Sequence, residues 1–178
     1  MTSIPYSATE PLPQEQLYVR AAEQFGAALE RLACGYERDT DRRRDLLQEI
    51  HLELWRSLAA FEFRASLRTW VYRIAHNVAA KHIWREQRAR LGQMLDLEAA
   101  AEAPIADATA GLEEAQVLQR LLAEIHRLVP LDRQVMLLYL DDLDAATIGE
   151  ITGLSSGAVA TKIHRIKTLL ARRLGAKE

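Results

Sequence analysis

The chain has 178 residues, of which 49% are hydrophobic and 27% charged, and its formal net charge is −2. These values are typical of a globular protein with one or two small domains. One cysteine excludes an internal disulfide, no apolar run approaches the roughly 20 residues of a membrane span, and the N-terminus lacks a signal pattern, so we expect a cytoplasmic protein without membrane insertion. Abundant Ala, Leu, Arg and Glu favour an all-α fold.

The charges divide the chain into three parts. Residues 1–95 hold 14 basic and 12 acidic side chains, residues 96–114 hold six acidic and no basic ones, and residues 115–178 hold nine basic and seven acidic ones. The acidic part is rich in Ala, contains Pro104 and Gly111, and has no amphipathic period strong enough for burial. The sequence therefore predicts four segments: a flexible leader (1–13), a first domain (14–95), an acidic linker (96–114) and a second domain (115–178).

Helical periodicity starts near Gln14 and predicts two helices before residue 61. In the first helix, apolar residues recur at helical spacing from Leu17 to Tyr36. The second follows a polar turn in which Thr40 or Asp41 is a candidate N-cap. Beside its core stripe it carries a second stripe of large apolar groups and fixed charges: Asp45, Gln48, Glu49, Leu52, Trp55 and Arg56.

This second stripe has two interpretations. A small domain rarely has room to bury both stripes of one helix. Leu52 and Trp55 exposed among acids and amides would have the composition of a protein-docking patch. The alternative is a helix packed between two neighbours, with Trp55 buried, and the sequence of this helix leaves both interpretations open.

The stretch 61–90 joins a helical pattern to a basic face with interleaved aromatic residues. Ser66 is a candidate N-cap, and apolar positions from Leu67 to Ile83 can be buried on one side. Residues 64–90 hold seven Lys or Arg against one acid, Glu86. Steps of three or four residues make a second line of planar and cationic groups: Trp70, Arg73, Asn77, Lys81, Trp84 and Arg88.

Such a line suits single-stranded nucleic acid. Aromatic planes stack on unpaired bases, Lys and Arg neutralise phosphates, and the amide of Asn77 has the donor and acceptor pair that can read a base edge. The alternative is an ordinary solvated helix face with Trp70 buried.

Beyond the acidic part, the pattern predicts four helices that end in a helix-turn-helix. An amphipathic helix over 118–128 stops at Pro130, and a short helix follows over 135–139. Asp144 is a candidate N-cap for a helix over 145–152, and Ser156 for the last helix. Five cations with no acid between them follow on that helix, and its first turns would present Ser156, Thr161 and Lys162 to a DNA major groove. The alternative is a helical hairpin with a solvated basic face.

Motifs for catalysis or cofactor binding are absent from the sequence. It has no phosphate-binding loop, no dinucleotide glycine pattern and no H-E-x-x-H. The five histidines are scattered, and Cys34 lacks Cys or His neighbours at metal-ligand spacing. We therefore expect no enzyme, no cofactor and no metal.

Two segments resemble the extracytoplasmic-function (ECF) group of sigma factors, the promoter-recognition subunits of bacterial RNA polymerase. DLLQEIHLELWRSLAAFE followed by SLRTWVYRIAHNVA is similar to region 2 of that family, and IGEITGLSSGAVATKIHRIK follows the plan of region 4. The resemblance covers about residues 17–174. It implies two small helical domains joined by a linker, the second with a helix-turn-helix, and a protein that directs core RNA polymerase to specific promoters.

The resemblance also implies roles for individual residues. In region 2, one helix docks on the polymerase clamp, the next meets the −10 element of the promoter, and the loop 62–65 would help to receive a flipped base. The polymerase-facing residues would be Asp45, Gln48, Glu49, Leu52 and Trp55. Those at the non-template strand would be Arg73, His76, Asn77 and Lys81, with Trp84 and Arg88 further along the helix. Those at the −35 element would be Ser156, Thr161, Lys162 and Arg165.

Two departures from the family pattern bear on these roles. Arg43-Arg44 stands where the family usually has Ala-Glu, on the polymerase side. Lys162 stands where Arg is common. A lysine can hold a phosphate but cannot make the bidentate contact with guanine that an arginine makes.

The partners implied are core RNA polymerase, promoter DNA (duplex at −35, single strand at −10) and, as a further candidate, an anti-sigma protein. Two other functions stay open on the sequence. One is a helix-turn-helix regulator that binds operators without polymerase, and the other is a helical module that only binds a partner.

Overall fold

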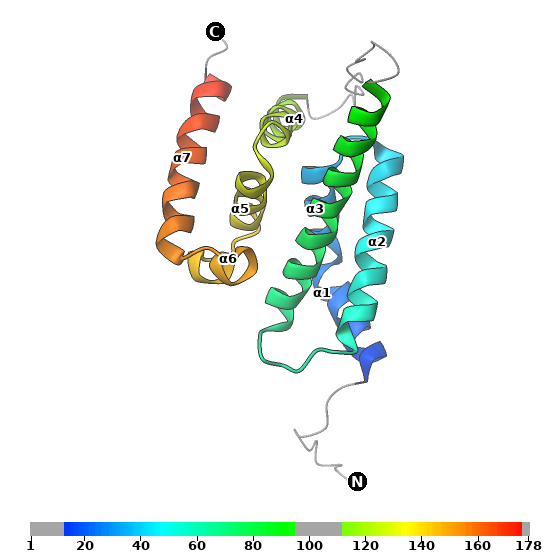
Figure 1. Cartoon of the computed structure of the whole chain (residues 1–178). Coiled ribbons are helices and arrows are strands. Elements are labelled where there is room, and N and C mark those ends of the chain that lie inside the picture. Colours follow the sequence, from blue (N-terminus) through cyan, green and yellow to red (C-terminus); the bar gives the residue numbers. More distant parts are fainter. Residues whose placement is uncertain (1–12, 95–111, 176–178) are drawn as a thin grey trace.

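The structure, a computed structural model, describes residues 13–94 and 112–175. These residues form helices and, within the described ranges, no strand, which confirms the all-α prediction (Figure 1). None of the described helices is long and apolar enough to cross a membrane. The helices are α1 (Gln14–Tyr36), α2 (Thr40–Leu58), α3 (Leu67–Met94), α4 (Leu112–His126), α5 (Pro130–Leu140), α6 (Ala145–Thr152) and α7 (Ser156–Gly175).

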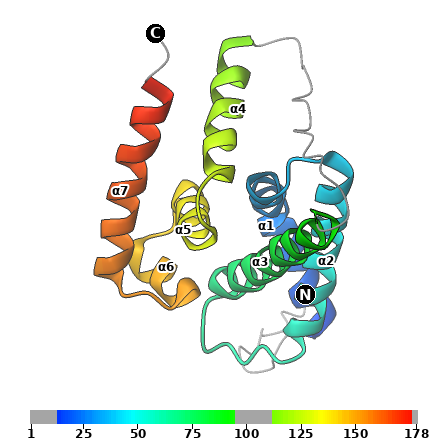
Figure 2. The same cartoon turned by 45° about the horizontal axis from the view of Figure 1, so that its top comes forward.

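Helices α1, α2 and α3 pack against one another as an N-terminal domain (Figures 1 and 2). Each helix contributes one buried stripe to a shared core, with Leu32 from α1, Ile50 from α2 and Val71 from α3 at most 1% exposed. Full burial of such a side chain contributes about 1.5–3 kcal/mol relative to exposure. The core therefore fixes the rotation of each helix and decides which residues face outward.

Capping residues set where α2 and α3 begin. Asp39 caps α2, because its carboxylate accepts hydrogen bonds from the backbone N–H groups of Asp41 and Arg42, 3.0 and 2.9 Å away. The cap thus lies one residue before the predicted Thr40 or Asp41. Ser66 caps α3 as predicted, with its hydroxyl oxygen 3.0 Å from the backbone nitrogen of Thr69. Such a cap stabilises a helix by typically about 1 kcal/mol.

Helices α4 to α7 form the C-terminal domain, and α6 and α7 make the predicted helix-turn-helix. Asp144 caps α6 through the backbone N–H of Thr147 at 2.8 Å, and Gly153 ends it with a φ of 78°, a left-handed conformation that favours glycine. The capping side chain at α7 is Ser155, which accepts from the N–H of Ala158 at 3.2 Å, and not the predicted Ser156. Helix α4 begins at Leu112, so the last three residues of the predicted linker are helical.

The two domains pack directly on each other. Helix α1 lies against α4 and α5, and α3 against α5 and α6 (Figures 1 and 2). The closest approach is at Gly35 of α1, where an added Cβ would lie 2.4 Å from Cδ2 of the buried Leu137 on α5. Polar contacts surround this point: Arg31 pairs with Asp141 at 2.7 Å, and the backbone oxygen of Cys34 lies 3.0 Å from Nε2 of His126. The domain interface therefore depends on a residue without a side chain.

We predict that Gly35→Leu separates the two domains without unfolding them. The leucine has no room beside Leu137, and overpacking of this kind costs about 1–3 kcal/mol. Small-angle scattering should show a larger radius of gyration, while circular dichroism should show unchanged helix content. Gly26→Leu is the matched control, because a Cβ at Gly26 on the same helix has nothing within 4 Å. An unchanged radius of gyration in Gly35→Leu would contradict this role of Gly35.

Candidate functional site

The second stripe of α2 lies on the surface of the N-terminal domain. Asp45 and Gln48 are exposed, and Leu52 and Trp55 expose 50% and 37% of their surface. Trp55 rests edge-on against Tyr18 of α1, with ring centroids 5.3 Å apart. Helix α2 packs between α1 and α3, yet its second stripe is not buried by them, so the alternative with Trp55 buried does not hold. An indole and an isobutyl group held in solvent beside polar groups form an apolar patch suited to a protein partner.

Glu49, another member of the stripe, is turned toward α3. Its carboxylate forms an ion pair with the guanidinium of Arg85. Both side chains stay partly exposed. The pair therefore joins the edge of the α2 stripe to the basic stretch of α3.

The exposed side of α3 carries most of the predicted nucleic-acid residues. Asn77, Lys81, Trp84 and Arg88 are all exposed and follow one another at helical spacing. Trp84 exposes 63% of its surface, the most of any large hydrophobic residue within the described ranges. A flat aromatic side chain beside cations can stack on a base while the cations neutralise phosphates.

His76 does not belong to this face, which corrects the prediction. Its side chain is 1% exposed, lies in the core of the N-terminal domain, and has its Nδ1 2.8 Å from the hydroxyl of Tyr36. Burial lowers the pKa of His76 to about 3, so the ring is neutral. His76 comes one residue before Asn77. Because consecutive residues of a helix point about 100° apart, Asn77 faces the surface while His76 faces the core.

Two arginines of the α3 face contact the C-terminal domain. Arg73 is half-buried and donates to the backbone oxygen of Glu150 on α6 at 3.0 Å. Arg68, which the sequence analysis did not single out as a site residue, donates to the backbone oxygen of Asp141 at 2.6 Å, just after α5. In this arrangement the C-terminal domain occupies part of the basic face. The position of Arg68 depends on tertiary packing, which no local pattern indicates.

The loop before α3 exposes an aromatic residue that the sequence analysis did not name individually. Phe63 has a φ of 58°, an uncommon value for a residue with a side chain, and it exposes 53% of its surface. Its ring lies 4.6 Å from that of Phe61, which in turn contacts Trp70. Trp70 is half-buried, with its indole N–H donating to the hydroxyl of Ser57 at 3.1 Å. The sequence signal that could have indicated an exposed Phe63 is its position between the charged residues Glu62 and Arg64.

Helix α7 presents three of the four residues predicted for duplex DNA. Ser156, Thr161 and Arg165 are exposed. Lys162 is half-buried and turned toward α5, where its ammonium lies 2.6 Å from a carboxylate oxygen of Asp132. In this structure Lys162 thus holds α7 against α5, and Arg165 is the exposed cation of the set.

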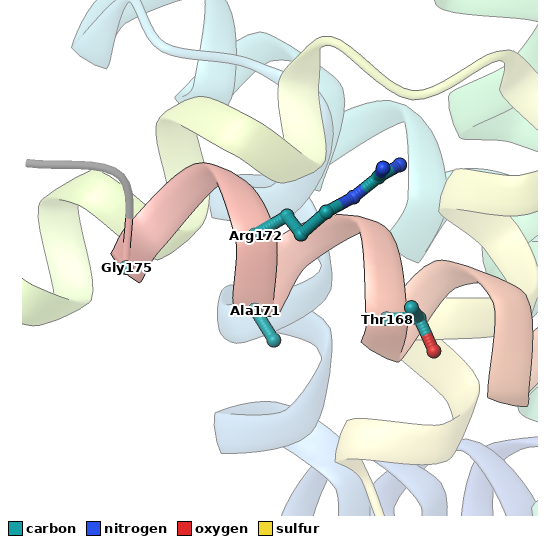
Figure 3. Close-up of a pocket in the computed structure, with 4 residues that line it drawn as sticks. All are labelled: Thr168, Ala171, Arg172 and Gly175. Carbon is teal, nitrogen blue, oxygen red and sulfur yellow. The ribbon is translucent and has the colours of Figure 1, made fainter.

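A shallow surface hollow lies along the C-terminal helix. Its lining residues are Thr168, Ala171, Arg172 and Gly175, all from α7 (Figure 3). A hollow built on one face of one helix cannot surround a small molecule, whereas ligand sites bury most of their ligand's surface. The arrangement of exposed groups therefore fits macromolecular partners.

Comparison with known families and structures gives matches in both domains. Residues 21–89 match the family described as Sigma-70 region 2, and residues 118–170 match Sigma-70, region 4. The chain is 28% identical over 144 residues to the ECF RNA polymerase sigma factor SigW of Bacillus subtilis, covering 73% of this chain and 74% of SigW. It is 28% identical over 163 residues to the ECF RNA polymerase sigma factor SigM of Mycobacterium tuberculosis, covering 90% and 76%.

Two solved structures share the fold. CnrH in complex with the cytosolic domain of CnrY superposes with a TM-score of 0.66 at 20% identity, covering 92% of this chain and 91% of that one. The sigma factor RpoE of Bartonella quintana, in complex with the anti-sigma factor NepR, superposes with a TM-score of 0.65 at 18% identity, covering 90% and 98%.

We predict that the buried His76 makes the stability of the protein depend on pH. Its pKa is about 3 when folded and about 6.5 when unfolded, so the folded state favours the neutral ring. Its contribution is fully present above pH 6.5, because the ring is neutral in both states. Below that pH the unfolded chain takes up a proton and the folded chain does not, so unfolding becomes easier by about 1.4 kcal/mol per pH unit.

Urea unfolding at several pH values between 7 and 4 tests this prediction. Carboxylates add their own pH dependence, so the informative quantity is the difference between wild type and His76→Phe, whose slope should be smaller. His164→Phe, at an exposed position on α7, is the control and should keep the wild-type slope. A His76→Phe curve parallel to that of the wild type would contradict the prediction.

Proposed function

The chain belongs to the sigma-70 family, as an RNA polymerase sigma factor of the ECF group, and from this premise we propose which of its surfaces carries each step of promoter recognition. The observation that carries the assignment is the order of the two matched regions, each on its own helical domain. A helix-turn-helix regulator that acts without polymerase is not favoured, because it would leave the region 2 domain without a role.

The α2 stripe is the proposed docking surface for core polymerase. Leu52 and Trp55 are the apolar anchors, and Asp45 and Gln48 are the polar groups around them. Few residues carry most of the binding energy of an interface, and exposed aromatic groups are enriched among them. Arg43 and Arg44, the departures from the family pattern, lie in the first turns of the same helix, so the polymerase side must accommodate added positive charge there.

The exposed face of α3 and the loop before it are the proposed surface for the −10 element. Asn77 lies one helical turn from both Arg73 and Lys81, so its amide is placed between two cations that can hold phosphates. Trp84 and Phe63 offer exposed rings for stacking, and Phe63 lies in the loop proposed to receive a flipped base. His76 has no part in this proposal, because it is buried.

DNA binding on this face requires the two domains to move apart. Arg73 and Arg68 donate to backbone oxygens of the C-terminal domain, which occupy the positions that phosphate oxygens would take. A hydrogen bond that involves a charged group contributes about 1.5–3 kcal/mol net, and phosphates can replace these contacts because they offer charged acceptors. We therefore propose that polymerase and promoter bind an opened form of the chain.

The first turns of α7 are the proposed reader of the −35 element. Ser156, Thr161 and Arg165 are exposed there, in the position of a recognition helix whose N-terminal residues enter the major groove. Arg165 can form two hydrogen bonds to a guanine, whereas Lys162 can act on DNA only after leaving Asp132.

Further features follow from the same proposal. The protein acts without catalysis, as a binding subunit in the cytoplasm, where its polymerase works. We place the first domain at residues 14–95 and the second at 115–178, and the helices described for them run from Gln14 to Met94 and from Leu112 to Gly175. CnrH and RpoE are both seen with a bound partner, CnrY and the anti-sigma factor NepR, so we propose an inhibitory partner of that kind for this chain.

The double substitution Leu52→Ala with Trp55→Ala should weaken binding to core polymerase by about 2 kcal/mol or more, because both anchors are lost. Run-off transcription by bacterial core polymerase on a genomic promoter library should fall accordingly. The protein should stay folded with a modestly lower melting temperature, since both side chains are partly exposed but Trp55 loses its contact with Tyr18. Val19→Ala removes an equally exposed apolar group from α1 and should leave transcription unchanged. Normal core binding by the double variant would refute the docking assignment.

Arg165→Ala and Lys162→Ala should differ in their effect on duplex binding. Loss of Arg165 removes an available phosphate or base contact, which should lower the slope of log affinity against log salt by about 0.9. Lys162→Ala should change the slope less, because its ammonium is already neutralised by Asp132, and it should lower the melting temperature. Fluorescence anisotropy with a −35 duplex at several salt concentrations measures both slopes. Equal slope changes would contradict the structural role of Lys162.

A further inference from the structure

Three side chains that can bind metals converge where the end of α1 meets α3. Glu37 is the residue after α1, and His82 and Glu86 lie one turn apart on α3. Nε2 of His82 is 3.2 Å from Oε2 of Glu37 and 3.9 Å from Oε1 of Glu86. All three atoms lie within 4.8 Å of one another. Two carboxylate oxygens thus face the same imidazole nitrogen.

These separations are close to those of a metal coordination shell. Tetrahedral ligands at about 2.1 Å from Zn²⁺ lie roughly 3.4 Å from each other. The separation of His82 from Glu37 is slightly shorter and that of His82 from Glu86 is longer, so small side-chain movements would bring the atoms into place. An imidazole nitrogen with carboxylate oxygens suits zinc and its neighbours in the first transition row, whereas Mg²⁺ and Ca²⁺ prefer oxygen ligands alone.

The surroundings hold the ligand atoms in this orientation. Glu37 is 7% exposed, and its Oε1 accepts the backbone N–H of Asp39 at 2.9 Å, which leaves Oε2 directed at His82. His82 is 9% exposed and fixed by its position on α3. Hydrogen bonds of this kind, which orient a ligand from behind, are a regular feature of metal sites in proteins.

A cation already lies beside the cluster. The guanidinium of Arg42 is 2.8 Å from Oε1 of Glu86. The side chain of Arg42 is 52% exposed, so this contact resembles surface ion pairs, which contribute little to stability. A divalent ion can therefore displace the guanidinium at little cost and supply the positive charge in its place.

We propose that Glu37, His82 and Glu86 form a binding site for one divalent transition-metal ion, with Zn²⁺ the best fit and water as the fourth ligand. The ion would tie the turn between α1 and α2 to α3, at a position flanked by Lys81 and Arg85 of the basic face. The spacing of ligands along the chain does not indicate this site, because 45 residues separate His82 from Glu37. The expectation of no metal rested on such spacing. This site is independent of the promoter-recognition proposal.

Isothermal titration of the untagged, chelator-treated full chain with Zn²⁺ tests the proposal. We expect saturable binding of one ion per chain and a higher melting temperature in the presence of Zn²⁺. Substitution of Co²⁺ should give the visible absorption of a tetrahedral site. His82→Ala should weaken Zn²⁺ binding at least tenfold, and His164→Ala, which removes an exposed histidine on α7, should leave it unchanged.

A second variant guards against loss of folding. If His82→Ala does not fold, Glu86→Gln keeps the size of a half-buried side chain, removes one ligand charge and should still weaken Zn²⁺ binding tenfold. The absence of saturable binding to the wild type would overturn the proposal. Binding of one ion with unchanged affinity in the ligand variants would overturn it equally, because the ion would then lie elsewhere.

Discussion

Burial of one side of α3 is the constraint on which the other surfaces depend. Val71, Ala75 and Ala79 are at most 1% exposed, and this apolar stripe fixes the rotation of the helix in the N-terminal domain. The opposite side, with Asn77 and Trp84, is thereby fixed in solvent. A rotation of α3 by about 100°, the angle between consecutive residues, would bury the amide of Asn77 and expose the apolar stripe. The orientation of the face proposed for DNA thus depends on side chains on the opposite side of the helix.

Much of the fold could be predicted from the sequence because its signals are local. Helical spacing indicated the helices, and Ser66 and Asp144 marked where two of them start. Two site residues could not be placed in this way. His76 has the polarity of a surface residue but finds a partner in Tyr36, and Lys162 finds one in Asp132, 30 residues away. Burial and pairing across helices depend on tertiary structure, which the spacing of residues along one helix does not predict.

The contacts that close the two domains combine apolar packing with polar contacts. At the centre, Gly35 allows α1 and α5 to touch. At the edge, Arg68 and Arg73 donate to backbone oxygens, which carry only partial charges. Phosphate oxygens are fully charged and can accept two parallel hydrogen bonds from one arginine, which makes them stronger acceptors than a backbone carbonyl. The closed arrangement therefore covers the basic face with weaker acceptors than nucleic acid offers.

The ion pair between Glu49 and Arg85 links the two faces of the N-terminal domain. Glu49 belongs to the stripe proposed for polymerase and Arg85 to the helix proposed for DNA, so each charge is bound to the other in the free protein. A partner that takes up Glu49 leaves Arg85 available to a phosphate, and the reverse holds to the same extent, since a coupling free energy is reciprocal. In the proposed assignment, occupation of one face would free the charge on the other, and for an exposed pair such coupling is limited to about 0–1 kcal/mol.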